Sequence, residues 1–401
     1  MIEQTTVTPS TVLIAERLVA ARRRAATFVR AAEIGKGDFS LVHSGSPGLF
    51  ARAIAVFGAT LVGCVDGLKA DRALLASKLR ADLRSYFRER QGVRITTDKP
   101  LMQALTFTLS ALAALGRLDE DPLEDLIKPL LKDDVDDVLK SVGALRGRPQ
   151  SGNIAMCLAV VLIHARQFLD MDTASALDTW VNLHLTHMNR FGFWGGEQGM
   201  THLQFQNGYH QYEILEYLQV DNPTLSAAKH AVLTLADPSG HFAPYPGGGG
   251  CYDYDAVFVL TAGGGVPDAD VRSLLERTAG SILHQQGADG GFCESRHVRP
   301  RSIANAQRFS HQVVSAWNRP SLFVERLRYA LTLQRPKHDE IHTHWSADGR
   351  GWDESNLWDT YFRLLALARI DVALNGSRAL SWGFLTYPGI GHHAQTVAEI
   401  A

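Results

Sequence analysis

Cysteine is scarce in this chain. Its four cysteines, Cys64, Cys157, Cys251 and Cys293, are far apart along 401 residues. They form neither a C-x-x-C pair nor the spacing of a zinc ribbon, which excludes the common cysteine-based metal and redox motifs. Scattered thiols of this kind are typical of a protein kept in a reducing compartment, so we expect a cytoplasmic protein.

The chain also lacks an excess of either charge. Its 40 Lys and Arg residues balance 42 Asp and Glu residues, which gives a formal net charge of -2. A nucleic-acid-binding protein generally needs a basic face, so we expect no nucleic-acid partner. Hydrophobic residues make up 45% and charged residues 20%, the composition of a soluble globular protein with a sizeable core.

Long apolar segments are missing as well. The longest apolar run, residues 53–65, is interrupted by glycine and is too short to cross a bilayer. The first residues show no basic segment followed by an apolar one and a small-residue cleavage site. We therefore expect no transmembrane segment, although the basic side of a helix predicted at residues 11–34 could contact a membrane surface.

Period-two alternation, the mark of β-strands, does not occur at any length, whereas helical periodicity is pervasive. From residue 70 onward, apolar segments alternate with amphipathic ones. The apolar segments begin near residues 100, 153, 208, 254, 308 and 358. A spacing of about 50 residues, repeated six times, indicates a repeat architecture.

The two kinds of segment predict where each helix lies. Helices that are apolar on all sides must be enclosed, while amphipathic helices face water. Six enclosed helices paired with six outer ones most simply close into an all-α α6/α6 toroid, with the N-termini of the inner helices at one end of a central cavity. We assign residues 71–401 to this toroid and residues 1–70 to an N-terminal helical extension. An open solenoid of helical hairpins is the structural alternative.

A glycine loop followed by two acids stands at the fourth of the six inner-helix starts. Gly247–Gly250 precede Asp253 and Asp255, and an apolar run continues from there. Acids at a helix start commonly cap its unpaired N–H groups, and that is the ordinary explanation for both residues. Their position also places them where a toroid would present its working residues.

Several segments resemble one superfamily. Residues 286–294, Q-G-A-D-G-G-F-C-E, resemble the Q-x-x-D-G-G-[FW]-x-E segment repeated in squalene–hopene cyclases, and residues 191–196 and 348–352 resemble weaker copies. Residues 205–213 resemble an inner helix of the protein prenyltransferase β subunit. Both families belong to the terpenoid cyclase and protein prenyltransferase superfamily. The resemblance, closest to squalene–hopene-type class II terpene cyclases, spans roughly residues 90–370 and implies an α/α toroid.

The two acids extend this resemblance. Asp253-Tyr254-Asp255-Ala256 is similar to the D-x-D-D motif of class II terpene cyclases, which protonate an alkene. Such chemistry needs a carboxyl group that keeps its proton, and burial beside a second acid has that effect. The resemblance implies that Asp255 is the proton donor and Asp253 its partner. At Ala256 the chain departs from the motif, which leaves the activation of the acid less well explained.

Zinc-dependent prenylation is not expected. Prenyltransferases hold zinc with Asp, Cys and His, whereas the matching positions here are Asn207, Tyr209 and Asp255, a poor set for activating a thiolate. We therefore expect no metal and no cofactor.

Aromatic and polar residues at loops and helix starts complete the candidate site. Aromatic faces stabilise a cation by about 0.5–2 kcal/mol each, although large aromatics at such positions can simply hold helices apart. The candidate catalytic residues are Asp255, Asp253, His210, Glu213 and His311. The candidate substrate-binding residues are Asn207, Tyr209, Tyr212, Trp194, Tyr254, Phe292, Cys293, Arg308, Trp358 and Asp359.

Three functions remain open. The first is a class II terpene-cyclase-like enzyme, an isomerase or lyase of isoprenoid biosynthesis in secondary metabolism, with a small apolar substrate. The second is a toroid enzyme acting on a polar substrate, such as a carbohydrate lyase, hydrolase or epimerase, with the five candidate catalytic residues as acid–base groups. The third is a non-catalytic binding protein in which the two aspartates are only helix caps. Fold alone does not choose among them.

Overall fold

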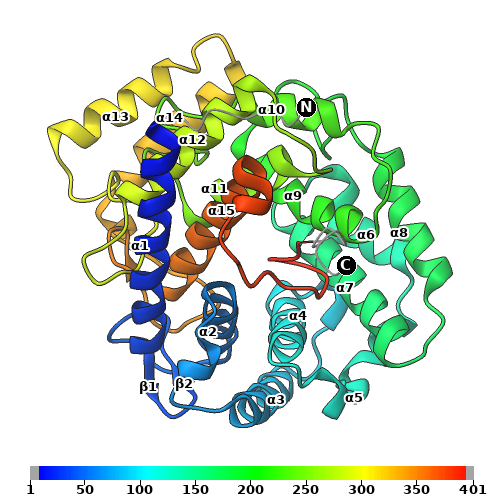
Figure 1. Cartoon of the computed structure of the whole chain (residues 1–401). Helices are drawn as coiled ribbons and strands as arrows, with labels where there is room; N and C mark the ends of the chain where they lie inside the picture. Colours follow the sequence, from blue (N-terminus) through cyan, green and yellow to red (C-terminus); the bar gives the residue numbers. More distant parts are fainter. Residues whose placement is uncertain (1–8, 394–401) are drawn as a thin grey trace, which may run out of the picture.

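The structure, a computed structural model, describes residues 9–393, and helices account for its architecture (Figure 1). Within these residues the chain forms fifteen α-helices and two short antiparallel strand pairs. In the first pair, β1 (Glu33–Gly35) lies beside β2 (Asp38–Phe39). In the second, β3 (Glu340–Ile341) lies beside β4 (Arg350–Gly351). The all-α prediction is confirmed.

Six helices form a closed inner ring around the centre of Figure 1. Each packs on the next along the chain, and the last packs back on the first. Nearly all of their side chains are buried, as expected for helices enclosed by neighbours. In order, they are α2 (Leu49–Val62), α4 (Lys99–Ala114), α7 (Ser151–Phe168), α9 (His202–Tyr217), α11 (Gly250–Thr261) and α15 (Leu357–Asn375).

Amphipathic helices surround this ring. α3 packs on α2 and α4, α6 and α8 pack on α7, α10 and α12 pack on α11, and α1 packs on α2, α12 and α15. The architecture is therefore the α6/α6 toroid that the spacing predicted. The outer helices are α1 (Pro9–Ala31), α3 (Arg72–Glu89), α6 (Val135–Val142), α8 (Ala174–Thr186), α10 (Leu225–Leu233) and α12 (Ala269–His284); the single-turn α5 (Glu124–Ile127) lies between α4 and α6 in the chain.

The helix expected to enter the inner ring near residue 308 does not do so. That helix, α13 (Ile303–Val314), pairs with α14 (Pro320–Leu333) outside the ring. Only one side of α13 is buried, and this side carries residues such as Phe309 and Val313. The helix is therefore amphipathic rather than enclosed. The prediction counted its apolar residues without resolving which side of the helix they occupy.

The N-terminal helices complete the two rings. α2, which the sequence analysis assigned to an N-terminal extension, is the first inner helix, and α1 is the outer helix that packs between α12 and α2. The inner helices consequently begin at residues 49, 99, 151, 202 and 250, and the sixth begins at 357, after the inserted α13 and α14. The regular repeat therefore starts one unit earlier than predicted.

The last described residues return into the ring (Figure 1). The Gly383 amide donates to the Leu61 carbonyl near the end of α2, and the Tyr387 hydroxyl bonds to His164 Nδ1 near the end of α7. Farther along, Pro388, Gly389 and Ile390 line a small cavity with side chains of the inner ring: Phe57, Thr106, Phe107, Ser110, Met156 and Val160. Residues 383–393, hereafter the floor segment, thus close the C-terminal end of the inner ring.

One described helix, α7, is long and apolar enough by length and composition to cross a membrane. Within this protein, 83% of that helix is buried by its neighbours. Its apolar character is accounted for by its place in the inner ring.

Candidate active site

The two aspartates after the glycine loop occupy different environments. α11 begins at Gly250, and no side chain caps its first N–H groups, so Asp253 is not the helix cap that the sequence suggested. Its carboxylate instead accepts hydrogen bonds from the Phe242 amide at 2.9 Å and from His241 Nδ1 at 2.8 Å. Arg363 of α15 binds the same carboxylate. Asp253 is therefore half of a buried ion pair.

The glycines of the loop allow its backbone to lie directly against buried carboxyl groups. Gly248 has a φ of +68°, and a Cβ at this position would lie 2.4 Å from Asp253 Oδ2. A Cβ on Gly249 would lie 2.4 Å from Glu294 Oε1, and one on Gly250 would lie 2.7 Å from Asp359 Oδ1. Only glycine fits such approaches, which explains the glycines at these three positions of the loop and the first residue of α11.

Asp255 has a fully buried carboxyl group whose two oxygens lack a hydrogen-bond partner. Burial, and then the neighbouring Glu213 carboxyl, raise the pKa of Asp255 well above its ordinary value; the Tyr209 phenol acts in the opposite direction. Burial and a neighbouring carboxyl both favour the protonated form of Asp255. Asp255 therefore differs from Asp253, whose carboxylate is bound by an arginine.

Glu213 of α9 is the second buried acid in the ring. Its Oε1 accepts a hydrogen bond from the Tyr254 hydroxyl at 2.8 Å, while Oε2 has no partner. Burial raises the pKa of Glu213 to about 8. The sequence analysis named Asp253 as the acid that holds the proton on Asp255, but Glu213 has the larger effect on the Asp255 pKa.

Two further polar side chains of α9 are buried beside these acids. His210 is one turn from Glu213, and neither of its ring nitrogens has a partner. Burial lowers the His210 pKa well below its ordinary value, so this ring is a neutral imidazole. Asn207 accepts from the Gly152 amide at 3.0 Å, but its own amide nitrogen is unpaired. Buried polar atoms are rarely left unpaired, which makes this cluster a candidate ligand-binding site.

Aromatic rings run continuously from these acids to α15 and the segment that precedes it. The Tyr209 and Tyr254 centroids are 6.0 Å apart, and Tyr254 is 5.6 Å from Phe362 of α15. Phe362 is 4.5 Å from Trp358, which stacks on Trp345 at 3.6 Å. Such a row provides several ring faces that could stabilise a cation.

A pocket lies at the end of this aromatic row, where the inner helices begin. It has a volume of about 360 Å³ and is lined by Lys99, Gln150 and residues 342–345. Lys99 is the first residue of α4, and Gln150 directly precedes α7. Because Trp345 lines this pocket and also stacks on Trp358, the aromatic row leads from the pocket toward Asp255.

A third group of buried acids, Glu294 and Asp359, is bound by polar side chains around the glycine loop, although Asp359 Oδ1 has no partner. Glu294 accepts hydrogen bonds from the Tyr245 hydroxyl and from Arg350, and Asp359 accepts from Asn356 at 2.6 Å and pairs with Arg350 at 3.4 Å. Burial raises the Glu294 pKa to about 7. These polar partners connect the glycine loop to the start of α15.

Trp194 and Tyr212 pack helices together and do not line the site. The Tyr212 hydroxyl donates to the Gly192 carbonyl at 2.5 Å, and Trp194 Nε1 donates to the His184 carbonyl at 3.0 Å. The first bond joins α9 to the loop that follows α8, and the second joins that loop to the end of α8. These two aromatics therefore have the structural role considered above, in which large aromatic side chains hold neighbouring helices apart.

Phe292 and Cys293 lie at the start of α15. The Asn356 amide donates to the Phe292 carbonyl at 3.0 Å, which ties the glycine-aromatic segment to that helix. Cys293 is buried, and burial raises its pKa to about 11. Its neighbour Arg363 belongs to the Asp253 ion pair, so Cys293 lies next to that pair.

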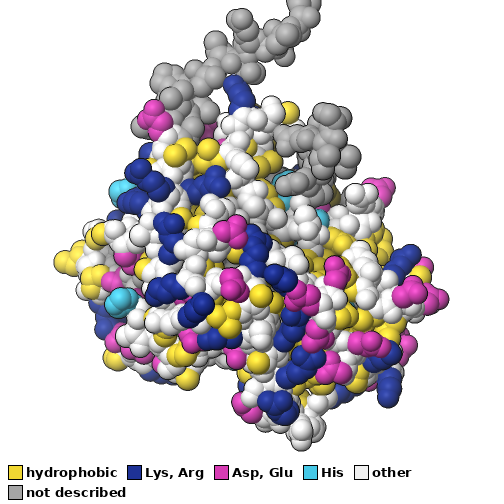
Figure 2. All heavy atoms as spheres, turned by 60° about the horizontal axis from the view of Figure 1, so that its bottom comes forward, with side chains coloured by type: hydrophobic (Ala, Val, Ile, Leu, Met, Phe, Trp, Pro, Cys, Tyr) yellow, Lys and Arg dark blue, Asp and Glu magenta, His cyan; other side chains and the backbone are white. Residues whose placement is uncertain are grey.

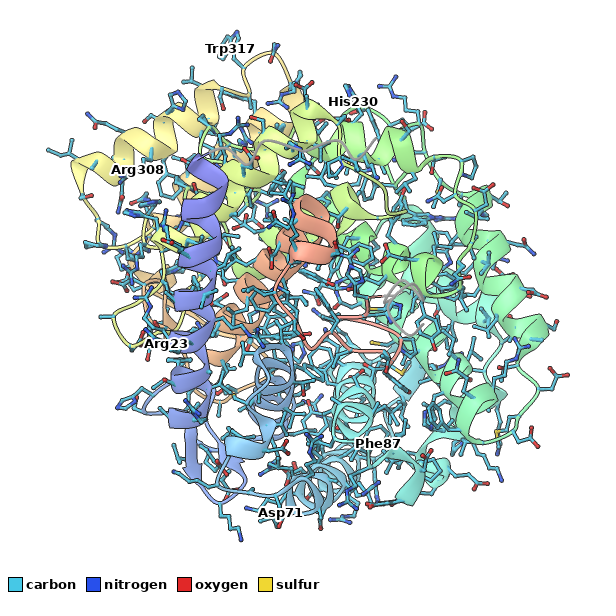
Figure 3. The ribbon with its side chains drawn as sticks, viewed as in Figure 1. Arg23, Asp71, Phe87, His230, Arg308 and Trp317 are labelled. Atoms are coloured by element: carbon cyan, nitrogen blue, oxygen red, sulfur yellow. The ribbon has the colours of Figure 1, made fainter. Side chains whose placement is uncertain are left out.

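His311 and Arg308 are not part of the cluster. Both side chains are exposed on α13, outside the inner ring, and Figure 3 shows Arg308 at the outer edge of the molecule. Their selection depended on the prediction that α13 was an inner helix. That prediction is wrong, because α13 packs on α14 instead.

Sequence reasoning missed Arg363 and His241, the partners of Asp253. Arg363 carried a usable signal, since an arginine inside the enclosed, largely apolar α15 needs a buried acid. His241 carried none, because it lies in a loop without periodicity. Within residues 9–393, no group of three or more His, Cys, Asp or Glu side chains is placed to hold a metal ion.

No protein-family model matches the sequence, and no curated protein matches it. Solved structures of the type II terpene cyclase MstE from Scytonema are similar to this chain. One variant, in complex with its substrate geranylgeranyl dihydroxybenzoate, has 15% identity and a TM-score of 0.46, over 90% of this chain and 99% of that one. The apo enzyme has 16% identity and a TM-score of 0.46, over 90% and 98%.

Proposed function

We propose that the protein is a class II terpene-cyclase-like enzyme that protonates an alkene of a small isoprenoid or related unsaturated compound. The observation that carries the proposal is the Asp255 carboxyl group. It is fully buried, both of its oxygens lack partners, and it lies beside Glu213 and Tyr209 at one end of the aromatic row. An alkene is a very weak base, so its protonation requires a carboxylic acid that is still protonated in a dry site.

The reaction consumes no co-reactant. The Asp255 O–H bond breaks, and its proton forms a C–H bond with the less substituted alkene carbon, which leaves a cation on the other carbon and a carboxylate on Asp255. The π electrons of a second alkene then form a C–C bond to that cation. Loss of a proton from a carbon next to the new cation restores an alkene and balances the first step. Substrate and product therefore have the same mass.

Surrounding residues have distinct roles in this proposal. Glu213 keeps the proton on Asp255, because two adjacent carboxyl groups do not both ionise cheaply. The rings of Tyr209, Tyr254, Phe362 and Trp358 stabilise the cation by about 0.5–2 kcal/mol each. In this proposal His210, a neutral imidazole with two unpaired nitrogens, accepts the proton lost in the last step.

The two ends of the ring bound the size of the substrate. Lys99 lines the pocket where the inner helices begin and is suited to a polar or anionic end of the substrate. At the opposite end, Pro388, Gly389 and Ile390 of the floor segment fill the space between the inner helices. In this proposal an apolar chain of limited length occupies the region between these two ends.

The geometry favours this function over the two alternatives. A polar-substrate enzyme would use five acid–base residues, but His311 is exposed on α13 and Asp253 is bound by Arg363. The remaining three, His210, Glu213 and Asp255, lie beside aromatic rings. A simple binding protein predicted that both aspartates would be helix caps, and no side chain caps α11.

The test is incubation of the purified protein with a panel of prenyl diphosphates and free polyenes in D₂O, followed by mass spectrometry. We expect an isomer of the substrate in which one carbon-bound hydrogen is replaced by deuterium, a mass increase of about 1 Da over the substrate. Asp255→Asn should abolish it without lowering the unfolding temperature. Asp178→Asn, which changes an exposed aspartate on α8, is the matched control. A product that Asp255→Asn forms at the wild-type rate would exclude the proposed donor.

A further inference from the structure

The helical hairpin inserted before α15 has an unusually apolar exposed surface. Within it, six large apolar side chains are between 37% and 80% exposed: Ile303, Val314, Trp317, Val324, Leu327 and Leu331. The other exposed large apolar side chains among the described residues are scattered over separate segments: Val19, Ile34, Val93, Leu203 and Val266. Single exposed apolar residues need no explanation, but a concentration in one short insertion indicates an interaction surface.

The spacing of these residues places them on particular helix faces. In α14, Val324, Leu327 and Leu331 follow each other at i, i+3 and i+7, which is one face of a helix. In α13, Ile303 and Val314 are eleven residues apart, close to three whole turns, so they also share a face. Trp317 lies in the turn between the helices, and Figure 3 shows it at the outer edge of the molecule.

The charges of the same insertion have one sign. Within residues 301–338, hereafter the α13–α14 hairpin, the exposed charged side chains are Arg301, Arg308, Arg328, Arg335 and Lys337. Arg301 pairs with Asp339 just beyond the hairpin. The one acid within it, Glu325, is turned toward the ring, where its carboxylate accepts from the amides of His202 and Leu203.

Other parts of the surface are different. Figure 2 shows the face at the bottom of Figure 1, where Lys and Arg are interspersed with Asp and Glu. There, Arg84 of α3 pairs with Asp121 and Asp125, and Arg94 pairs with Asp133. The α13–α14 hairpin therefore combines exposed apolar side chains with an excess of cations that the whole chain, at a net charge of -2, does not have.

We propose that the α13–α14 hairpin binds an anionic lipid bilayer. A helix pair with exposed Trp, Leu and Val beside Arg and Lys lies well at the interface between headgroups and acyl chains, and anionic lipids complement its cations. The hairpin packs outside the inner ring, so its exposed side can meet a membrane without opening the toroid. This inference does not depend on the proposed reaction.

The experiment is co-sedimentation of the full-length protein with vesicles of phosphatidylcholine alone or mixed with phosphatidylserine. We expect binding to the phosphatidylserine vesicles that weakens as salt is added. Arg308→Gln and Arg328→Gln should each weaken that binding by about fivefold, because one cation near such a surface contributes on that scale. Trp317→Ser and Leu331→Ser should weaken it at high salt as well, since they remove apolar contact.

Two variants at other exposed sites are matched controls. Lys132→Gln removes an exposed cation, and Val266→Ser removes an exposed apolar side chain, both away from the hairpin. Neither should change vesicle binding. All six variants alter exposed side chains, so their unfolding temperatures should match that of the wild type.

Three outcomes would overturn the proposal. Absence of vesicle binding, or equal binding by the hairpin variants and the controls, would exclude the hairpin as a lipid site. Salt-sensitive binding to polyglutamate without binding to vesicles would assign the surface to an acidic polypeptide. A dimer in sedimentation velocity that Trp317→Ser dissociates, again without vesicle binding, would assign it to a second copy of the chain.

Discussion

Asp253 and Arg363 form an ion pair in which neither side chain is exposed to solvent. They belong to α11 and α15, so the pair joins two neighbouring inner helices beside the candidate acid Asp255. Arg363 also donates to the carbonyls of Gly247 and Glu294 at 3.1 and 2.9 Å. Removing one member of such a pair leaves an uncompensated charge in the interior, which is more damaging than the intact pair is stabilising.

Asp253→Asn should therefore lower the free energy of unfolding by about 3–5 kcal/mol. Asp255→Asn should change it by less than about 1 kcal/mol, because that carboxyl has no ion-pair or hydrogen-bond partner to lose. Urea denaturation of both variants measures the difference. Equal destabilisation by the two substitutions would contradict the assignment of Asp253 as an anchor and Asp255 as an unpaired acid.

The raised pKa of Glu213 predicts a specific dependence of stability on pH. Between its ordinary value of 4.5 and the folded value of about 8, the folded protein holds a proton that the unfolded chain has released. Stability must then fall as the pH rises through this range, with a slope of about 1.4 kcal/mol per pH unit for one proton.

Glu213→Gln should reduce that slope by the contribution of about one proton. Measured against the wild type, the variant should therefore gain stability at pH 8 compared with pH 5. The measurement is urea denaturation of variant and wild type at several pH values. Because Glu213 also raises the Asp255 pKa, the substitution lowers the Asp255 contribution in the same direction, and the difference between the two curves reports the coupled pair of carboxyls. Parallel curves would mean that Glu213 ionises normally in the folded protein.

Gly248→Ala tests the close approach of the glycine loop to Asp253. Gly248 and Gly264 have nearly the same φ, +68° and +66°, but a Cβ on Gly248 would lie 2.4 Å from Asp253 Oδ2, while one on Gly264 meets nothing within 4 Å. Gly264→Ala should cost about 1 kcal/mol, the usual penalty for alanine at positive φ. Gly248→Ala should cost clearly more, and equal losses in thermal unfolding would show that the loop relaxes without strain.

Ile390→Ala tests the floor segment. It should destabilise the protein by about 2–5 kcal/mol and enlarge the cavity that Ile390 lines with Phe57 and Met156. If the proposed reaction is correct, the variant should turn over a longer prenyl chain relative to the wild type. Ile282→Ala, at a buried position of the outer helix α12, should destabilise similarly without changing chain-length preference. The same shift in both variants would exclude a floor role.

The fold was largely predictable because helical periodicity is a local property. Apolar and amphipathic segments identified enclosed and outer helices without any knowledge of contacts. There were two exceptions. α2 was assigned to an extension because the alternation of apolar and amphipathic segments was counted only from residue 70. α13 was assigned to the inner ring although its apolar residues cover one side only. Deciding whether α2 or α13 completes the six inner helices requires knowing which of them closes the ring. Ring closure is a contact between residues distant in the chain, which periodicity does not report.

The candidate site was predictable in part for the same reason. Asp255, Glu213, His210 and Tyr209 were found because they lie on segments recognisable as inner helices. The pairing of Asp253 with Arg363 could not be found, because 110 residues separate them. The floor segment could not be found either, since its glycine- and proline-containing sequence has no periodicity. His311 was assigned to the site only through the misplaced α13.

The position of α1 has a consequence for how the protein is made. This first helix packs on α15, the last of the ring, so residues 9–31 have no complete binding surface until residue 357 and those after it have been synthesised. At about 5–20 residues per second, that delay is on the order of tens of seconds. During translation the apolar side of α1 stays exposed beside an incomplete ring. A chaperone that binds this helix in the nascent chain would favour correct closure.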